Sequence, residues 1–211
     1  MGLQQYWKKR NFQRTPEPRG KNVPPDGRLR FVIQKHAASR LHYDFRLELN
    51  GTLKSWAVPK GPSLDPAQKR LAVHVEDHPL EYAGFEGVIP EKQYGGGTVL
   101  LWDRGYWEPI GDPGSSYRRG RLTFTLHGEK LHGIWNLVRM GGRKEDGKEN
   151  WLLIKEDDEE AQRGKRGDIT QTLEESVASG KTLEQIAAGE PAVWQPERPS
   201  GKKSRAGSAP R

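Results

Sequence analysis

Nine residues decide the fold of this chain: Leu41-His42-Tyr43-Asp44-Phe45-Arg46-Leu47-Glu48-Leu49. Apolar and polar side chains alternate strictly along them, and Asn50-Gly51 and a second run, 52–58, follow directly. Because successive side chains of a strand point to opposite faces, the alternation predicts a β-strand with one apolar face. Asn-Gly between two such runs is a strong signal of a tight hairpin turn. The stretch therefore predicts an antiparallel sheet.

Further alternating runs follow along the chain, at 70–77, 98–102, 121–127, 131–139 and 151–154. Glycines punctuate them at Gly95-Gly96-Gly97, Gly105, Gly128 and Gly141-Gly142. Many short strands separated by turns are typical of an antiparallel barrel or sandwich. A helix signal appears late, where Thr182 and Gln185 fit a capping box. The pattern predicts a mainly β protein with few short helices.

Composition excludes several classes of protein. The 211 residues carry 35 Lys+Arg against 28 Asp+Glu, a formal charge of +7, and contain no cysteine. The length suits one domain with tails. The missing cysteines exclude disulfides, thiolate zinc sites and a cysteine nucleophile. No apolar run approaches the roughly 20 residues of a membrane span, and no apolar stretch follows the first charges. We expect a cytoplasmic protein with no membrane partner.

Charge and proline content suggest four segments. Residues 1–28 form a basic, partly flexible arm, in which four prolines disfavour regular structure. We assign 29–165 to the β-domain, 166–194 to a helical extension, and 195–211 to a disordered basic tail or linker. The basic excess permits a polyanion partner, although a solvated basic surface would explain it equally well.

The predicted strand over 41–49 also carries a group of polar side chains that could act together. A period of two places His42, Asp44 and Arg46 on one face, with the apolar side chains behind them. Imidazole and carboxylate suit a divalent transition metal such as Mn²⁺ or Zn²⁺, and a guanidinium suits phosphate oxygens. His36 would add an imidazole if the chain folds back after it. The alternative is a half-exposed strand whose outer face is simply polar.

A second run places His74, Glu76 and His78 on one face by the same alternation. A histidine there could act as general acid or base or contact phosphate. For His74 we favour a structural or solvent-facing side chain. Tyr82 could donate a hydrogen bond to phosphate, but a tyrosine after a strand is more often a packing residue. The three glycines at 95–97 fit a hairpin turn better than a phosphate-binding loop.

Residues 34–48, QKHAASRLHYDFRLE, resemble the signature of the 3′-phosphoesterase domain of bacterial DNA ligase D, an end-joining repair enzyme. The resemblance continues at 53–62, 75–82, 85–90, 94–95 and 101–105, and covers 29–155 well. It implies a β-barrel with a crescent-shaped active-site groove. It also implies removal of a 3′-terminal ribonucleoside, which leaves a 3′-phosphate, and then hydrolysis of that phosphate to a 3′-hydroxyl.

The resemblance also implies a metal site. By motif position, His36, His42 and Asp44 would bind Mn²⁺, with other divalent transition metals as alternatives. Gln34 and Glu76 would support the site.

The remaining roles in the core motifs concern phosphate. Arg46 and His78 would contact the scissile phosphate, with Tyr82 beside them. Lys60 and Arg70 would assist the phosphomonoesterase step. His78 could protonate the leaving oxygen or orient the attacking group, and the sequence leaves both roles open.

The arm departs from the family pattern at one position. Arg10 and Glu17 match residues that assist ribonucleoside removal, but Asn11 stands where an acid is expected. An amide cannot act as a base, so the phosphodiesterase step is less secure than the phosphomonoesterase step. The implied partners are DNA or RNA-tailed DNA 3′ ends, and ligase and polymerase domains in cis or in trans. We expect a monomer. The alternative function is a non-catalytic scaffold that binds DNA ends.

Overall fold

The computed structural model describes residues 2–20, 27–141 and 149–189. The strands within these ranges are β1 (Leu29–Ala37), β2 (Leu41–Leu49), β3 (Thr52–Val58), β4 (Arg70–His74), β5 (Gly87–Ile89), β6 (Gly97–Pro109), β7 (Arg121–Gly128), β8 (His132–Arg139) and β9 (Asn150–Lys155). The α-helices are α1 (Gln4–Lys8), α2 (Pro113–Arg119) and α3 (Leu183–Ala188), and the 3₁₀ helices are η1 (Leu80–Gly84), η2 (Gly164–Gly167) and η3 (Ile169–Gln171). None of these helices is long and apolar enough to cross a membrane.

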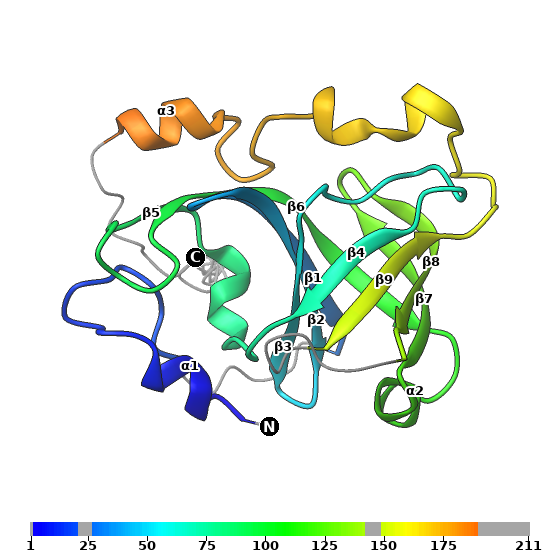
Figure 1. Cartoon of the computed structure of the whole chain (residues 1–211), viewed down its shortest axis with the longest axis horizontal. Helices are drawn as coiled ribbons and strands as arrows, with labels where there is room; N and C mark the ends of the chain where they lie inside the picture. The colour runs from blue at the N-terminus through cyan, green and yellow to red at the C-terminus, as the bar shows by residue number, and fades with distance from the viewer. Residues whose placement is uncertain (1, 21–26, 142–148, 190–211) are drawn as a thin grey trace, which may run out of the picture.

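The strands close into an antiparallel barrel (Figure 1). Their order is β1-β2-β3-β4-β9-β8-β7-β6, and β6 pairs back with β1 to complete eight strands. β5 adds to the free edge of β6 beyond the end of β7. The predicted mainly β fold, an antiparallel barrel with few short helices, is confirmed.

The predicted hairpin joins β2 to β3. Asn50 and Gly51 have φ values of 54° and 75°, which a two-residue type I′ turn requires at both positions. The turn sets Leu49 opposite Thr52 and fixes the register of both strands. It therefore decides which β3 side chain faces each polar residue of β2.

The barrel interior is filled by the apolar faces of the strands. Its largest fully buried side chains include five tryptophans: Trp56, Trp102, Trp107, Trp135 and Trp151. Leu41 does not join them, although the alternation places it on the apolar face. It is 49% exposed because it begins β2 beyond the end of the core.

One glycine lies inside a strand and not in a turn as the sequence suggests. Gly105 belongs to β6, which continues to Pro109, past the predicted end at Trp102. A Cβ atom at Gly105 would lie 2.0 Å from the carbonyl oxygen of His127 on the neighbouring strand. The glycine therefore allows β6 and β7 to approach each other closely.

The polar faces of β1, β2 and β3 are covered, which corrects the interpretation of a half-exposed outer face. Asp44 and Arg46 are 7% and 2% exposed. A second apolar cluster packs outside the barrel and consists of Tyr6, Leu53, Leu80, Tyr82, Phe85, Ile89 and Val99. These residues come from the arm, from η1 and from the strands beneath, so the polar side chains lie between two apolar cores.

The described part of the arm, residues 2–20, packs on the barrel. The Tyr6 hydroxyl donates to the Pro18 carbonyl at 2.6 Å, and the Trp7 indole donates to the Arg19 carbonyl at 2.8 Å. α1 begins the arm ahead of its prolines, so a short helix forms where the sequence analysis expected no regular structure.

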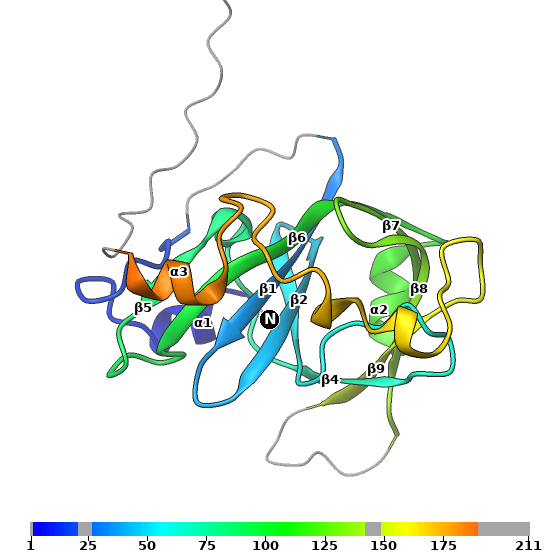
Figure 2. The ribbon, with the colours of Figure 1, turned by 90° about the horizontal axis from the view of Figure 1, so that it is seen from above.

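The extension crosses one end of the barrel, with α3 against β5 and β6 (Figures 1 and 2). Leu183 and Ile186 of α3 pack against the barrel core. The predicted capping box is confirmed, because the Thr182 side chain accepts from the Gln185 backbone and the Gln185 side chain accepts from Thr182. The predicted tail, 195–211, lies outside the described residues.

The hairpin turn gives a prediction about stability. Gly51→Ala places a Cβ atom on a left-handed residue, so we expect unfolding to require about 1 kcal/mol less free energy, measured by chemical denaturation. Gly84→Ala is the matched control, because Gly84 also has open space around it but no positive φ. Equal effects of the two substitutions would contradict the assigned turn.

Candidate functional site

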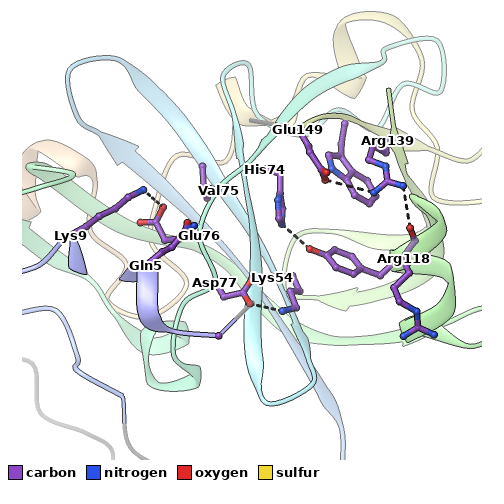
Figure 3. A pocket seen from close by; sticks show the side chains of 13 residues that line it. Gln5, Lys9, Lys54, His74, Val75, Glu76, Asp77, Arg118, Arg139 and Glu149 are labelled. Atoms are coloured by element: carbon purple, nitrogen blue, oxygen red, sulfur yellow. Dashed lines mark hydrogen bonds and ion pairs between the residues drawn. The ribbon is translucent and has the colours of Figure 1, made fainter. Parts of the chain in front are cut away.

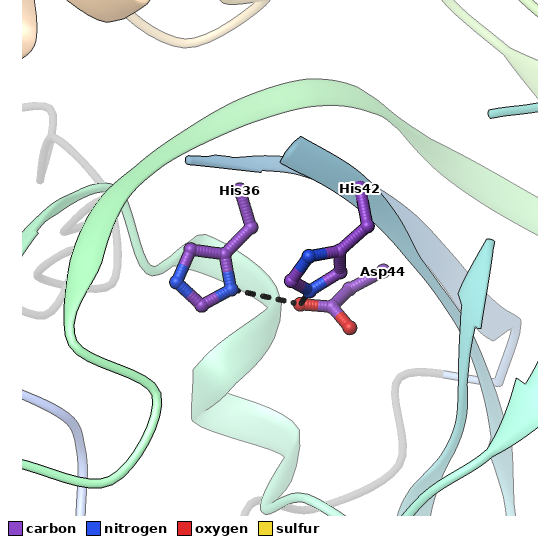
Figure 4. A group of neighbouring side chains, drawn as sticks. All are labelled: His36, His42 and Asp44. Carbon is purple, nitrogen blue, oxygen red and sulfur yellow. Dashed lines mark ion pairs between the residues drawn. The ribbon is translucent and has the colours of Figure 1, made fainter. Parts of the chain in front are cut away.

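Three side chains that could hold a metal converge on β1 and β2. His36 lies directly opposite His42 across the two strands, and Asp44 lies two residues further along. The Asp44 Oδ2 atom is 3.5 Å from His36 Nδ1 and 3.7 Å from His42 Nε2 (Figure 4). One possible ligand atom from each residue lies within 4.8 Å of the others. The predicted return of the chain after His36 is confirmed.

Backbone carbonyls hold the other nitrogen of each imidazole. His36 Nε2 donates to the Gly95 carbonyl, and His42 Nδ1 donates to the Arg40 carbonyl, both at 2.9 Å. Because a carbonyl can only accept, these bonds leave His36 Nδ1 and His42 Nε2 to face Asp44. Metal-binding histidines are oriented in this way. Burial opposes a charge on His42, but the interactions with Asp44 outweigh it and raise the pKa of His42.

Arg46 lies beside the three candidate ligands, and each of its three guanidinium nitrogens has one partner. Its Nε donates to Gln34 Oε1 at 2.8 Å, its Nη1 donates to Ser55 Oγ at 2.9 Å, and its Nη2 lies 3.1 Å from Asp44 Oδ2. Burial disfavours the Asp44 carboxylate, yet Arg46 and the two histidines hold the pKa of Asp44 well below its usual value. Asp44 is therefore ionised and fit to bind a cation.

Gln34 connects this face to η1. Its amide nitrogen donates to the carbonyls of Tyr82 and Phe85, at 3.1 and 2.8 Å. A register shift between Ile33 and Gln34, where β1 pairs with β6, adjoins this position. The Tyr82 ring lies 4.8 Å from the Arg46 guanidinium carbon, and burial raises the pKa of Tyr82 well above 10. The Tyr82 hydroxyl therefore keeps its proton.

His78 reaches the site from an irregular segment. The predicted strand over 70–77 ends at His74, so the expectation that His74, Glu76 and His78 share a strand face is wrong. The chain turns away after β4, and His78 pairs with Leu53 through two backbone hydrogen bonds. His74 instead hydrogen-bonds the Tyr117 hydroxyl at 2.9 Å.

The hydrogen bonds of His78 determine its protonation. Nδ1 donates to the Glu76 carbonyl at 2.9 Å, and Nε2 accepts from Arg10 Nη2 at 3.1 Å. Burial and the charges of Arg46 and Arg10 lower the pKa of His78 well below 6.5. His78 is therefore neutral, with a proton acceptor at Nε2.

The arm adds a buried ionic network above His78. Arg10 pairs with Glu17 at 2.7 Å and with Glu76 at 3.2 Å, and Lys9 pairs with Glu76 at 3.0 Å. The side chains of Arg10, Glu17 and Glu76 are at most 4% exposed. The structure thus brings the predicted arm residues together with His78.

Asn11 has a local role in the arm. Its side-chain oxygen accepts from the Gln13 backbone at 3.1 Å, and its carbonyl accepts from Arg14 and Thr15. The side chain is exposed and shapes a turn. An aspartate could make the same bond, so the turn itself does not explain the amide.

Two predicted residues lie apart from this network. Lys60 is exposed in the turn that follows β3, where the Gly61 backbone donates to the Val58 carbonyl. Arg70 pairs with Asp168 of the extension at 3.8 Å, and lines a different cavity with Asp65. Within the described residues, no hydrogen bond or ion pair joins either one to the three ligands.

Ser55 was not among the residues predicted for the site. It lies opposite Arg46 on β3, accepts from Arg46, and lies 3.4 Å from His78 Nδ1. The sequence contains the signal that would have found it. A two-residue turn at Asn50-Gly51 pairs Leu49 with Thr52, and the same register three residues further along each strand pairs Arg46 with Ser55.

A groove of about 420 Å³ begins at the outer side of the arm (Figure 3). Lys9 and Glu76 line one end, the Lys54–Asp77 ion pair lines the middle, and Arg139 lines the other end. None of the three candidate ligands lines it. The groove is therefore distinct from the group of candidate metal ligands.

The family model for the DNA ligase D 3′-phosphoesterase domain matches residues 34–139. This chain belongs to that family. The match covers the candidate residues of the 3′-phosphoesterase domain described above, except Arg10 and Glu17 in the arm. The predicted resemblance is confirmed.

Relatives of this domain family are longer proteins. The chain is 56% identical over 184 residues to the multifunctional non-homologous end joining protein LigD of Pseudomonas aeruginosa, covering 86% of this chain and 22% of the relative. The protein of that name in Mycolicibacterium smegmatis is 43% identical over 159 residues, covering 71% of this chain and 20% of the relative. The chain thus spans about a fifth of the length of these relatives.

The neutral state of His78 is testable by NMR. We expect its ring resonances to stay constant from about pH 8 to pH 6, where an ordinary histidine gains most of a proton. Arg10→Met removes the positive charge beside His78 Nε2 and should raise the pKa of His78. Lys8→Met, at an exposed position of α1, is the control and should leave the pKa of His78 unchanged. Titration of wild-type His78 at the ordinary pH would contradict the assigned hydrogen bonds.

Proposed function

We propose that this domain is a metal-dependent 3′-phosphoesterase that acts on DNA 3′ ends, with Mn²⁺ as its metal. The observation that carries the proposal is the placement of Arg46 3.1 Å from Asp44, beside two imidazoles that face the same carboxylate. A guanidinium suited to phosphate oxygens thus lies next to side chains that could hold a metal. Membership in a family described by 3′-phosphoesterase activity supports it.

The donor set fits a divalent transition metal. Two imidazoles and one ionised carboxylate suit Mn²⁺, and other divalent transition metals are alternatives. His36, His42 and Asp44 would hold the ion. When bound, it would polarise the phosphoryl group for attack.

The surrounding side chains would bind and orient the phosphate. Arg46 has five N–H donors, and its bonds to Gln34, Ser55 and Asp44 leave others for phosphate oxygens. The Tyr82 hydroxyl can donate because its raised pKa keeps it protonated. His78 carries no proton at Nε2, and its one lone pair there accepts from Arg10, which favours an orienting role for His78 over protonating the leaving oxygen.

We further propose two successive reactions, removal of a 3′-terminal ribonucleoside and then of the 3′-phosphate. The buried Arg10–Glu17 pair next to His78 supports a role of the arm in the first. Lys60, exposed in the turn after β3, and Arg70 would serve the second. Asn11 remains the reason to expect a slower first reaction.

The setting of these reactions is also a proposal. The names of the relatives suggest that the DNA ends belong to non-homologous end joining. Ligase and polymerase domains would be partners in cis or in trans, and the domain would act as a monomer in the cytoplasm.

The metal ligands give a direct test. With Mn²⁺ present, the wild-type protein should release phosphate from a DNA primer that ends in a 3′-phosphate. His42→Ala should slow release on the order of a hundredfold or more, because it removes a ligand. His132→Ala is the control, since that histidine is exposed on β8.

The same assay separates catalysis from scaffolding. Chelation by EDTA should abolish phosphate release while binding to the primer persists. Binding without any release at any metal concentration would favour the non-catalytic scaffold. Unchanged release by His42→Ala would contradict the metal site.

A further inference from the structure

Tyr94 lies on the loop between β5 and β6, beside a candidate metal ligand. It is 45% exposed. The next residue, Gly95, holds His36 Nε2 with its carbonyl at 2.9 Å, and a Cβ atom on Gly95 would lie 3.8 Å from the His36 ring. The loop therefore packs its backbone against His36, and Tyr94 immediately precedes the residue that makes this contact.

The arm holds the same ring from another element. Lys9 Nζ donates to the Tyr94 hydroxyl at 3.1 Å and lies 4.6 Å from the ring centroid. The Arg10 guanidinium carbon lies 5.5 Å from that centroid. Lys9 is itself tied to Glu76. The ring is thus fixed between the metal-site loop and the ionic network of the arm, although nearly half of the residue is open to solvent.

These contacts distinguish Tyr94 from the other exposed aromatic side chain in the described ranges, Trp7. Trp7 bonds the Arg19 carbonyl within the arm. Tyr94 instead connects the arm to the loop that orients His36. Single exposed apolar side chains are common on protein surfaces, so exposure alone does not distinguish Tyr94. Its contacts with the arm and its place in the loop that orients His36 do.

We propose that Tyr94 stacks on the base of the 3′-terminal nucleoside, and so acts as a specificity-determining residue for nucleoside removal. The inference rests on the proposed function, in which the phosphate binds at Arg46 and the nucleoside extends toward the arm. A base presents a flat π face to an aromatic ring whatever its identity. The Tyr94 hydroxyl accepts from Lys9, which helps to hold the ring in this position. A 3′-phosphate end has no such nucleoside, so Tyr94 contributes nothing to its hydrolysis.

Three primers on one template test this proposal with Mn²⁺ present. The first ends in a ribonucleoside with its base, the second in the same ribose without a base, and the third in a 3′-phosphate. Tyr94→Ala should lower kcat/KM for the first primer by about five- to a hundredfold, the range for one base stacked on an aromatic ring. The second and third primers should react at wild-type rates within about twofold.

Two further variants serve as controls. Tyr94→Phe keeps the ring and should retain most of the activity on the first primer. Ile110→Ala removes a side chain of similar exposure, 51%, in the turn after β6, and should change none of the three reactions. Thermal unfolding of each variant checks that the fold is intact.

Slowing of all three primers by Tyr94→Ala, or of none, would overturn the stacking role. If the wild-type protein turns over no primer, the proposed function fails, and binding then decides the inference. Fluorescence anisotropy would measure the affinity of the metal-free protein for the first two primers. Weaker binding by Tyr94→Ala to the base-bearing primer alone supports stacking, and equal binding to both primers by wild type and variant contradicts it.

Discussion

The buried charge of Arg46 is the constraint on which the site depends. A guanidinium that is 2% exposed must find partners, because an unpaired buried charge costs several kcal/mol. Its partners come from three neighbouring strands: Gln34 on β1, Asp44 on β2 and Ser55 on β3. Each bond fixes a side chain that has a second task. Gln34 holds η1, Asp44 faces the two imidazoles, and Ser55 approaches His78.

The arm adds a second buried cation whose charge is balanced by acidic partners. This cation is Arg10, which pairs with Glu17 and Glu76 and donates to His78. Burial and the charges of Arg46 and Arg10 keep the imidazole of His78 neutral by lowering its pKa, even though Asp44 nearby favours the charged form. The site therefore combines buried cations, an ionised carboxylate and an uncharged imidazole. These charge states follow from which groups are paired.

Much of the fold could be predicted from alternation alone, because a period of two reports which way each side chain of a strand points. The β2–β3 hairpin and the shared face of His42 and Asp44 are examples. Alternation does not report what covers a face, so the burial of Asp44 under the arm and η1 was not foreseen. It also does not report where pairing stops. β4 ends at His74, and the register against β3 has shifted by one residue where His78 pairs with Leu53, while Glu76 in between binds the arm.

The roles of single residues required the family resemblance, and the structure separates them. The ligands and Arg46 meet, while Arg70 contacts Asp168 of the extension. The central claim is that one divalent ion is held by His36, His42 and Asp44. Anomalous diffraction at the manganese edge, on crystals grown with Mn²⁺, tests it most directly. We predict one strong peak within bonding distance of His36 Nδ1, His42 Nε2 and an Asp44 oxygen. A peak bound by other residues, or none at saturating Mn²⁺, would contradict it.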